Sequence, residues 1–269
     1  MEFNGRISIV IPVLNEEKNI QPLYDQLHDQ LNSISSDFEI IFVDDGSTDT
    51  TASVILEISE KDSRVSSLVF SRNFGHQMAL FAGLDYASGK VVITMDGDLQ
   101  HPPSMIPKLI EEYHKGYHIV NTIRKDANKT SLFKKLSSKF YYRLANWLSD
   151  VYIEPAAADF RLMSREALVE FRKLRENNRF NRGLISWMGF NQTSIPYQAH
   201  ERFSGQTKFS FRRMLHFGLD GITSFSAKPL RIAAATGLLI FLFGFLYGII
   251  ALINYFSGNT IAGWTSILI

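Results

Sequence analysis

The sequence contains no cysteine, which excludes disulfide bonds, thiolate chemistry and a cysteine-ligated zinc site. It also has little net charge, +1 over 269 residues, so nothing in the global balance indicates a nucleic-acid partner. The first six residues lack the basic segment and the long apolar run that begin a signal peptide. With 45% hydrophobic and 20% charged residues, the composition fits one or two globular domains.

Two glycine-rich nucleotide-binding loops are also missing. No G-x-G-x-x-G follows the first apolar run, and no G-x-x-x-x-G-K-[ST] occurs in the chain. These absences argue against a dinucleotide-binding Rossmann domain and against a P-loop. If the protein binds phosphates, we therefore expect a metal and basic side chains to hold them.

Short apolar runs alternate with helical periodicity over the first half of the chain. The runs predict strands at residues 7–12, 38–43, 65–70, 90–95 and 117–123. Ser47, Thr48 and Asp49 are good N-caps for the helix after the second run. Strands that alternate with single helices predict an α/β fold with a doubly wound, mostly parallel sheet.

Acidic residues follow two of these predicted strands. Asp44 and Asp45 follow the second strand, and Asp96 and Asp98 follow the fourth. The ends of parallel strands meet at one edge of a sheet, so these carboxylates should converge there. Asp96 and Asp98, with the nearby amide of Gln100, would suit Mg²⁺ or Mn²⁺ bridging nucleotide phosphates. By itself, Asp-x-Asp is more often a surface turn, since Asp-Gly is ordinary turn chemistry.

A basic, aromatic-rich helix is predicted over residues 129–147. Such a helix can lie at a membrane surface or pack within an oligomer, or it can pack on the sheet with its lysines in solvent. Further on, three alanines precede Asp159, which suggests a close backbone approach and a carboxylate that points into a cleft. A helix cap, or an ion pair between Asp159 and Arg161, would explain the same segment.

The C-terminal part is more apolar. About 22 residues from Ile232 to Ile253 carry no formal charge, enough to cross a ~30 Å hydrocarbon core. Residues 209–219 interleave aromatic with basic side chains, which is typical of an interfacial amphipathic helix. Lys228 and Arg231 precede the span and residues 254–265 contain no Lys or Arg, so the preceding domain should be cytoplasmic. Residues 264–269 look like the start of a second, truncated span.

The order of the polar motifs resembles the family 2 glycosyltransferases of GT-A fold, in the branch that acts on polyprenyl phosphates. The resemblance rests on Val10-Ile11-Pro12 with Asn15-Glu16-Glu17, Val43-Asp44-Asp45-Gly46-Ser47-x-Asp49, Arg72-Asn73-Phe74-Gly75-His76-Gln77, Met95-Asp96-x-Asp98-Leu99-Gln100-His101-Pro102, Asp159-Phe160-Arg161 and the segment from Arg202 to Lys208. The form of the third motif, with a membrane region after it, is most similar to bactoprenol glucosyltransferases. A Gln-x-x-Arg-Trp motif, which marks processive synthases of the superfamily, is absent, so we expect a single transfer.

The resemblance implies roles for individual residues. Pro12, Glu16, Asp44, Asp45, Asp96 and Gln100 would bind the nucleotide sugar, and Asp96, Asp98 and Gln100 would hold the Mg²⁺ or Mn²⁺. Asp159 would lie beside the acceptor as a catalytic residue together with Asp96 and Asp98, acting either as a base or as an orienting group. Arg202 and Lys208 match the family's basic loop and would bind the acceptor and the diphosphate. We add Arg182 to them because a cation is needed between two anionic substrates.

We therefore expect an inverting, metal-dependent hexosyltransferase that moves glucose from UDP-glucose to a polyprenyl phosphate. GDP-mannose or a UDP-linked modified sugar is an alternative donor, and a non-catalytic sugar-nucleotide-binding membrane scaffold is an alternative of another class. The expected organisation is a cytoplasmic GT-A domain over residues 1–205, interfacial helices over 206–230 and a membrane region over 231–269, with its first span at about 232–255. This organisation predicts a multi-pass protein of the cell (inner) membrane. The sequence leaves the donor, the isoprenoid length and self-association open.

Overall fold

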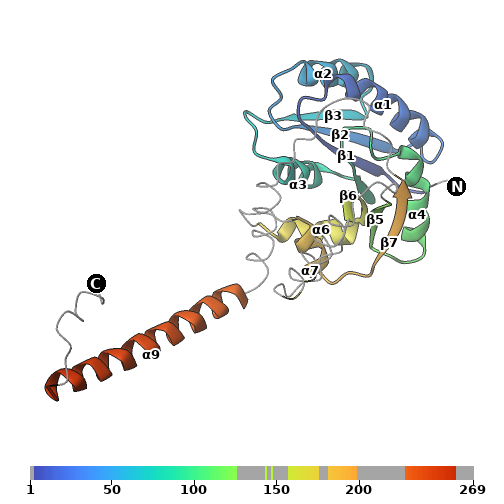
Figure 1. Cartoon of the computed structure of the whole chain (residues 1–269). Coiled ribbons are helices and arrows are strands. Elements are labelled where there is room, and N and C mark those ends of the chain that lie inside the picture. The colour runs from blue at the N-terminus through green and yellow to red at the C-terminus, as the bar shows by residue number, and fades with distance from the viewer. Residues whose placement is uncertain are drawn as a thin grey trace.

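A computed structural model describes residues 3–125, 143, 147, 157–175, 181–198 and 228–258 (Figure 1). The strands are β1 (Ile7–Val13), β2 (Phe38–Asp44), β3 (Val65–Val69), β4 (Val91–Thr94), β5 (Ile119–Lys125), β6 (Ala157–Ser164) and β7 (Gln192–Gln198). The helices are α1 (Glu17–Asn32), α2 (Thr51–Lys61), α3 (His76–Tyr86), the 3-10 turn η1 (Pro103–Met105), α4 (Ile106–His114), α6 (Arg165–Lys173), α7 (Asn181–Trp187) and α9 (Lys228–Phe256).

The strands form one mixed sheet in the order β3-β2-β1-β4-β6-β5-β7. All neighbouring pairs in it are parallel except those of β6, which runs antiparallel to both β4 and β5. The five predicted strands are present, and the mostly parallel α/β sheet is confirmed. The sequence interpretation missed β6 and β7. Because β6 runs antiparallel between β4 and β5, it places Arg161 opposite Thr94, the last residue of β4.

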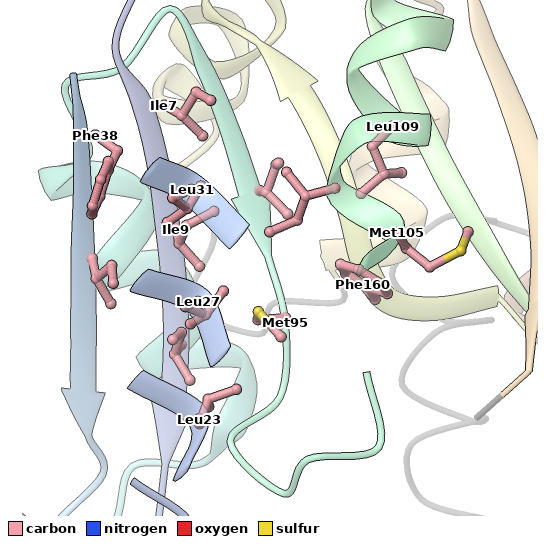
Figure 2. Packing of buried hydrophobic residues seen from close by; sticks show 14 of the residues in the cluster. Ile7, Ile9, Leu23, Leu27, Leu31, Phe38, Met95, Met105, Leu109 and Phe160 are labelled. Carbon is pink, nitrogen blue, oxygen red and sulfur yellow. The ribbon is translucent and has the colours of Figure 1, made fainter. Parts of the chain in front are cut away.

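Helices cover both faces of the sheet, and the alternation of side chains along β1 decides which residues meet which helices. Ile7, Ile9 and Ile11 face the cluster built with α1 and α4, whereas Val10 faces the cluster built with α3 and α6. Figure 2 shows Leu23, Leu27 and Leu31 of α1 stacked along the sheet, next to Ile7 and Ile9. These residues are fully buried, so the doubly wound arrangement follows from the apolar face of each helix.

One glycine lets α3 approach the sheet closely. A Cβ built on Gly83 would lie 2.3 Å from Val10 Cγ1 and 2.9 Å from Val43 Cγ2. No side chain fits at those distances. The contact fixes the height of α3 above β1 and β2, and so the position of its first turn at the carboxyl edge of the sheet.

Helix α9 differs from the rest of the chain. Its 29 residues form a single helix (Figure 1). Large apolar side chains are exposed along this helix. Of the helices in the described ranges, it is the one long and apolar enough to cross a membrane, over Leu230–Phe256. Lys228 to Leu230 belong to this helix, although the predicted interfacial segment extended to residue 230. The predicted helix over 129–147, except positions 143 and 147, the segment 206–227 and the second span lie outside the described residues.

Candidate functional site

The loops after β1 and β2 are tied together at the carboxyl edge of the sheet. Asn15, at a left-handed φ of 52°, accepts a hydrogen bond on Oδ1 from the backbone N of Thr48 at 2.8 Å. Its own backbone N donates to Ser47 Oγ, also at 2.8 Å. The backbone N of Glu16 donates to Thr51 Oγ1 at 2.9 Å, so Glu16 is held at the same junction.

The predicted N-cap of α2 is wrong. The helix begins at Thr51, and its N-cap is Thr50, whose side chain makes no capping bond. Asp49 still holds the start of the helix, because its Oδ1 accepts a hydrogen bond from the backbone N of Thr51 at 3.0 Å. Ser47 and Thr48 are used in the junction with the β1 loop instead.

Asp44 and Asp45 are adjacent and buried, but their surroundings differ. Oδ1 of Asp44 accepts from the backbone N of Ser47 at 2.9 Å, whereas its Oδ2 is buried without a hydrogen-bond partner. Asp45 accepts from the backbone N of Phe74 at 2.7 Å and of Gly75 at 3.0 Å, which holds the loop that leads into α3. Asp44 therefore offers an acceptor atom to a ligand, while Asp45 orders the loop. A nucleotide-binding role for either residue stays a prediction.

The segment after β4 presents the two carboxylates of the Asp-x-Asp motif. Leu99 has a left-handed φ of 63°, and the backbone N of Gln100 donates to Asp98 Oδ1 at 3.1 Å. Oδ1 of Asp96 is buried and accepts no hydrogen bond. The Gln100 amide oxygen accepts from Arg124 Nη1 at 3.1 Å, so it already has a protein partner.

A buried histidine holds the backbone of this segment. The backbone N of Asp96 donates to His101 Nδ1 at 2.9 Å, which requires an unprotonated Nδ1 and places the ring proton on Nε2. Nε2 lies 3.7 Å from Asp96 Oδ2. The imidazole stacks on Phe160 at 5.1 Å between centroids and meets the edge of Tyr197 at 5.7 Å. Residues from β6 and β7 therefore fix the ring that positions Asp96.

Asp159 lies on β6, so the helix-cap interpretation is wrong and the ion pair with Arg161 is confirmed. Oδ1 accepts from Arg161 Nη2 at 3.1 Å and from Arg182 Nε at 2.9 Å, and Oδ2 accepts from Arg182 Nη2 at 3.1 Å. Gln77 Nε2 donates to the same Oδ2 at 3.4 Å. Burial opposes ionisation, but Arg182, His76 and Arg161 outweigh it and hold the pKa of Asp159 well below its usual range. Asp159 is therefore an ionised, fully surrounded carboxylate.

His76 lies between the two groups of carboxylates. Its Nε2 is 3.5 Å from Asp96 Oδ1 and 3.5 Å from Asp159 Oδ2. Burial disfavours the charged imidazole, but Asp159 and Asp96 outweigh it and raise the pKa of His76 to about 9. At neutral pH the ring is therefore a cation that links β4 to β6.

The structure thus brings together Pro12, Glu16, Asp44, Asp45, Asp96, Asp98 and Gln100 at the ends of β1, β2 and β4, with Asp159 and Arg182 beside them. Arg202 and Lys208 lie outside the described residues. Sequence reasoning assigned no roles to His76, Gln77, His101 and Arg124, and it considered Arg161 only as an ion-pair partner of Asp159. His76, Gln77 and His101 were quoted within the motifs, but only the fold shows that they contact Asp96 or Asp159. Arg124 contacts the Gln100 amide instead.

The chemistry of the Asp-x-Asp segment fits a divalent cation. Within the described residues, no three His, Cys, Asp or Glu side chains are grouped as a complete metal site. Mg²⁺ commonly takes only one or two carboxylates and completes its shell with waters and substrate phosphates. The buried Asp96 Oδ1, which accepts no hydrogen bond, and the Asp98 carboxylate suit such an incomplete site.

Residues 8–172 match the model of Glycosyl transferase family 2. The chain belongs to this family. It is 42% identical over 270 residues to an uncharacterized glycosyltransferase, YkcC, of Bacillus subtilis, covering 100% of this chain and 84% of that protein. It is 40% identical over 265 residues to a bactoprenol glucosyl transferase of Shigella phage SfV, covering 98% of this chain and 86% of that protein.

A solved structure of lower identity shows the same fold. Glucosyl-3-phosphoglycerate synthase from Mycobacterium tuberculosis, in complex with Mn²⁺, UDP-glucose and phosphoglyceric acid, superposes with a TM-score of 0.52. The match has 18% sequence identity and covers 81% of this chain and 80% of that one. The GT-A-like architecture expected from the motifs is therefore confirmed.

Proposed function

We propose that this family 2 glycosyltransferase transfers glucose from UDP-glucose to a polyprenyl phosphate, with inversion at the anomeric carbon. The relationship to the phage bactoprenol glucosyl transferase extends over 98% of the chain, which supports this donor and acceptor. The apolar helix α9, long enough to cross a membrane, supports a lipid-linked acceptor. A position of the sheet domain on the cytoplasmic side, from Lys228 and Arg231, is part of the same proposal.

The observation that carries the choice of acceptor is the pairing of Asp159. This carboxylate is surrounded by Arg161, Arg182, His76 and Gln77, and its pKa is held well below the usual range. Such a group is a poor proton acceptor, so it would give little help to a sugar hydroxyl. A phosphate monoester has its second pKa near 6 and is already mostly a dianion at neutral pH. It can attack without a base.

In the proposed reaction, an oxygen of the acceptor phosphate forms a bond to the anomeric carbon while the bond from that carbon to the UDP oxygen breaks. The products are UDP and polyprenyl-phosphate glucose, and no external oxidant or reductant is needed. Asp159 would orient Arg182 toward the acceptor instead of removing a proton. Arg202 and Lys208 remain candidates for holding the same phosphates, and cationic side chains there would offset the repulsion between two anionic substrates.

Asp96 and Asp98 would hold a Mg²⁺ or Mn²⁺ ion. When bound, the ion would neutralise the charge that develops on the leaving diphosphate. The buried Asp96 Oδ1 without a hydrogen bond supports this assignment. Gln100 is a weaker candidate ligand than the sequence suggested, because its amide oxygen accepts from Arg124. The buried Asp44 Oδ2 would accept a hydrogen bond from the nucleoside part of the donor.

The proposal is tested with the full chain in detergent, a short polyprenyl phosphate and either Mn²⁺ or Mg²⁺. UDP-glucose, UDP-GlcNAc and GDP-mannose are supplied separately, and both nucleotide diphosphate release and lipid-linked sugar mass are measured. We expect metal-dependent product from UDP-glucose and at least about a 100-fold loss of turnover in Asp98→Ala.

Three results would contradict the proposal in different ways. Product from GDP-mannose alone would show that UDP-glucose is not the donor. Release of UDP without a lipid product would show that polyprenyl phosphate is not the acceptor. Nucleotide binding without turnover by any donor would favour the non-catalytic scaffold.

A further inference from the structure

Two helices meet at their first turns beside Asp159, and one glutamine joins them. Gln77 is the second residue of α3, and Asn181 is the first residue of α7. The backbone N of Asn181 donates to Gln77 Oε1 at 3.2 Å, and Asn181 Nδ2 donates to the Gln77 backbone O at 3.0 Å. Asn181 is 1% exposed, so this double hydrogen bond lies in the interior.

The same glutamine also reaches the site. Its amide Nε2 donates to Asp159 Oδ2 at 3.4 Å, so its two side-chain polar atoms serve different partners. Arg182 follows Asn181 in α7 and donates twice to Asp159, from Nε at 2.9 Å and from Nη2 at 3.1 Å. Gln77 therefore contacts both the carboxylate and the helix turn that presents the arginine to it.

Helix α7 depends on its contact with α3 for its position. The helix has only seven residues, too few to be stable without tertiary contacts. Its partner α3 is fixed on the sheet by the Gly83 contact with Val10 and Val43. Through Gln77, the fixed helix α3 therefore determines where the short helix α7 lies.

We propose that Gln77 is a positioning residue, which fixes α7 through Asn181 so that Arg182 is held against Asp159 in the geometry that binds the acceptor phosphate. This inference rests on the proposed function for its catalytic consequence. The structural half does not depend on it, because the junction between α3 and α7 exists whatever the substrate is. Gln77 itself need not touch a substrate.

The test compares Gln77→Ala, Gln77→Glu, Asn181→Ala and the double variant Gln77→Ala/Asn181→Ala in the full chain. Turnover of UDP-glucose with polyprenyl phosphate is measured together with amide hydrogen exchange over α7. Gln21→Ala is the matched control, because Gln21 also donates to a carboxylate, Asp25 Oδ1 at 2.8 Å, but on the exposed face of α1.

We expect Gln77→Ala to lower kcat by about 10- to 100-fold, with little change in KM for UDP-glucose, because misplacement of a positioned group is costly. Amide exchange should accelerate in α7 and not in α1 or α2. The double variant should lose no more activity than the worse single variant, since both break one junction. Gln77→Glu keeps an acceptor for the Asn181 backbone N but faces Asp159 with a second carboxylate. It should therefore lose turnover while α7 stays protected.

A kcat for Gln77→Ala within about twofold of the Gln21→Ala control would overturn the inference, as would loss of turnover in Gln77→Ala without faster exchange in α7. Equal acceleration of exchange throughout the chain would also overturn it, because Gln77 would then be a general stability residue. If the wild-type chain transfers no sugar while exchange in α7 still responds to Gln77→Ala, the proposed function fails and the structural junction stands.

Discussion

Two carboxylates at the same edge of the sheet, Asp96 and Asp159, show opposite environments. The Asp96 side chain is 37% exposed, and its buried Oδ1 accepts no hydrogen bond. The Asp159 side chain is 8% exposed, and each of its oxygens is in contact with at least two donors. Acidic residues at one edge of a sheet therefore need not share a role. Asp159 holds cationic side chains in place, and we propose that Asp96 binds a ligand instead.

Two histidines, His76 and His101, both contact Asp96. His101 accepts from its backbone N, and His76 approaches its side chain from α3. Neither gives Oδ1 a hydrogen bond, so both orient Asp96 while leaving that oxygen without a hydrogen-bond partner. Both oxygens of Asp159, in contrast, accept hydrogen bonds from neighbouring side chains.

Removal of one partner from Asp159 should have the largest effect on stability. Arg161 is 3% exposed and donates to Asp159 Oδ1, so Arg161→Met would leave a buried carboxylate with less compensation. We expect a loss of about 3 kcal/mol in the free energy of unfolding. The same substitution at Arg6, whose pair with Asp37 is about half exposed, should cost less than about 1 kcal/mol. Chemical unfolding of the full chain in detergent measures both, and equal losses would contradict the account.

A smaller effect is expected at a surrounded carboxylate outside the site. Asp62 accepts from Arg64 Nε and Nη2, both at 2.9 Å, and from the Tyr24 hydroxyl at 2.9 Å. The hydrogen bond from Arg64 is the main cause that lowers the pKa of Asp62 to about 2. Its stabilising contribution is therefore complete above about pH 5 and is lost as the pH falls toward 2.

Asp62→Asn should accordingly lower the free energy of unfolding by about 2 kcal/mol at pH 7. The variant and the wild type should converge as the pH falls from about 5 toward 2. Unfolding measured across this range tests the prediction, with Asp25→Asn on the exposed face of α1 as control. A difference that does not change with pH would mean that Asp62 acts through packing and not through its charge.

The sequence predicted one half of the site better than the other for a physical reason. β1, β2 and β4 are mostly apolar runs, and β2 and β4 lead into acidic residues, so both the strands and the convergence of Asp44 and Asp96 could be inferred. β6 instead buries Asp159 and Arg161 within the strand, and the pairing that makes this burial possible is invisible to a hydrophobic pattern. β7, with the sequence QTSIPYQ, pairs with one neighbour at the sheet edge and has little apolar signal.

Apart from the pair with Arg161, the contacts around Asp159 were beyond sequence reasoning for a related reason. His76 and Gln77 come from α3, and Arg182 comes from α7, about a hundred residues further along the chain. Spacing along the chain says nothing about which donors meet one carboxylate. The antiparallel insertion of β6 decides it.

The most direct test of the central comparison is the Mn²⁺ dissociation constant, measured by titration in the presence of UDP for the wild type, Asp96→Asn and Asp159→Asn. We predict that Asp96→Asn raises the constant about tenfold or more, while Asp159→Asn changes it by less than about threefold. Two results would contradict the account: both variants raise the Mn²⁺ dissociation constant to the same degree, or only Asp159→Asn raises it. Either result would mean that Asp96 is not the metal ligand that distinguishes the two carboxylates.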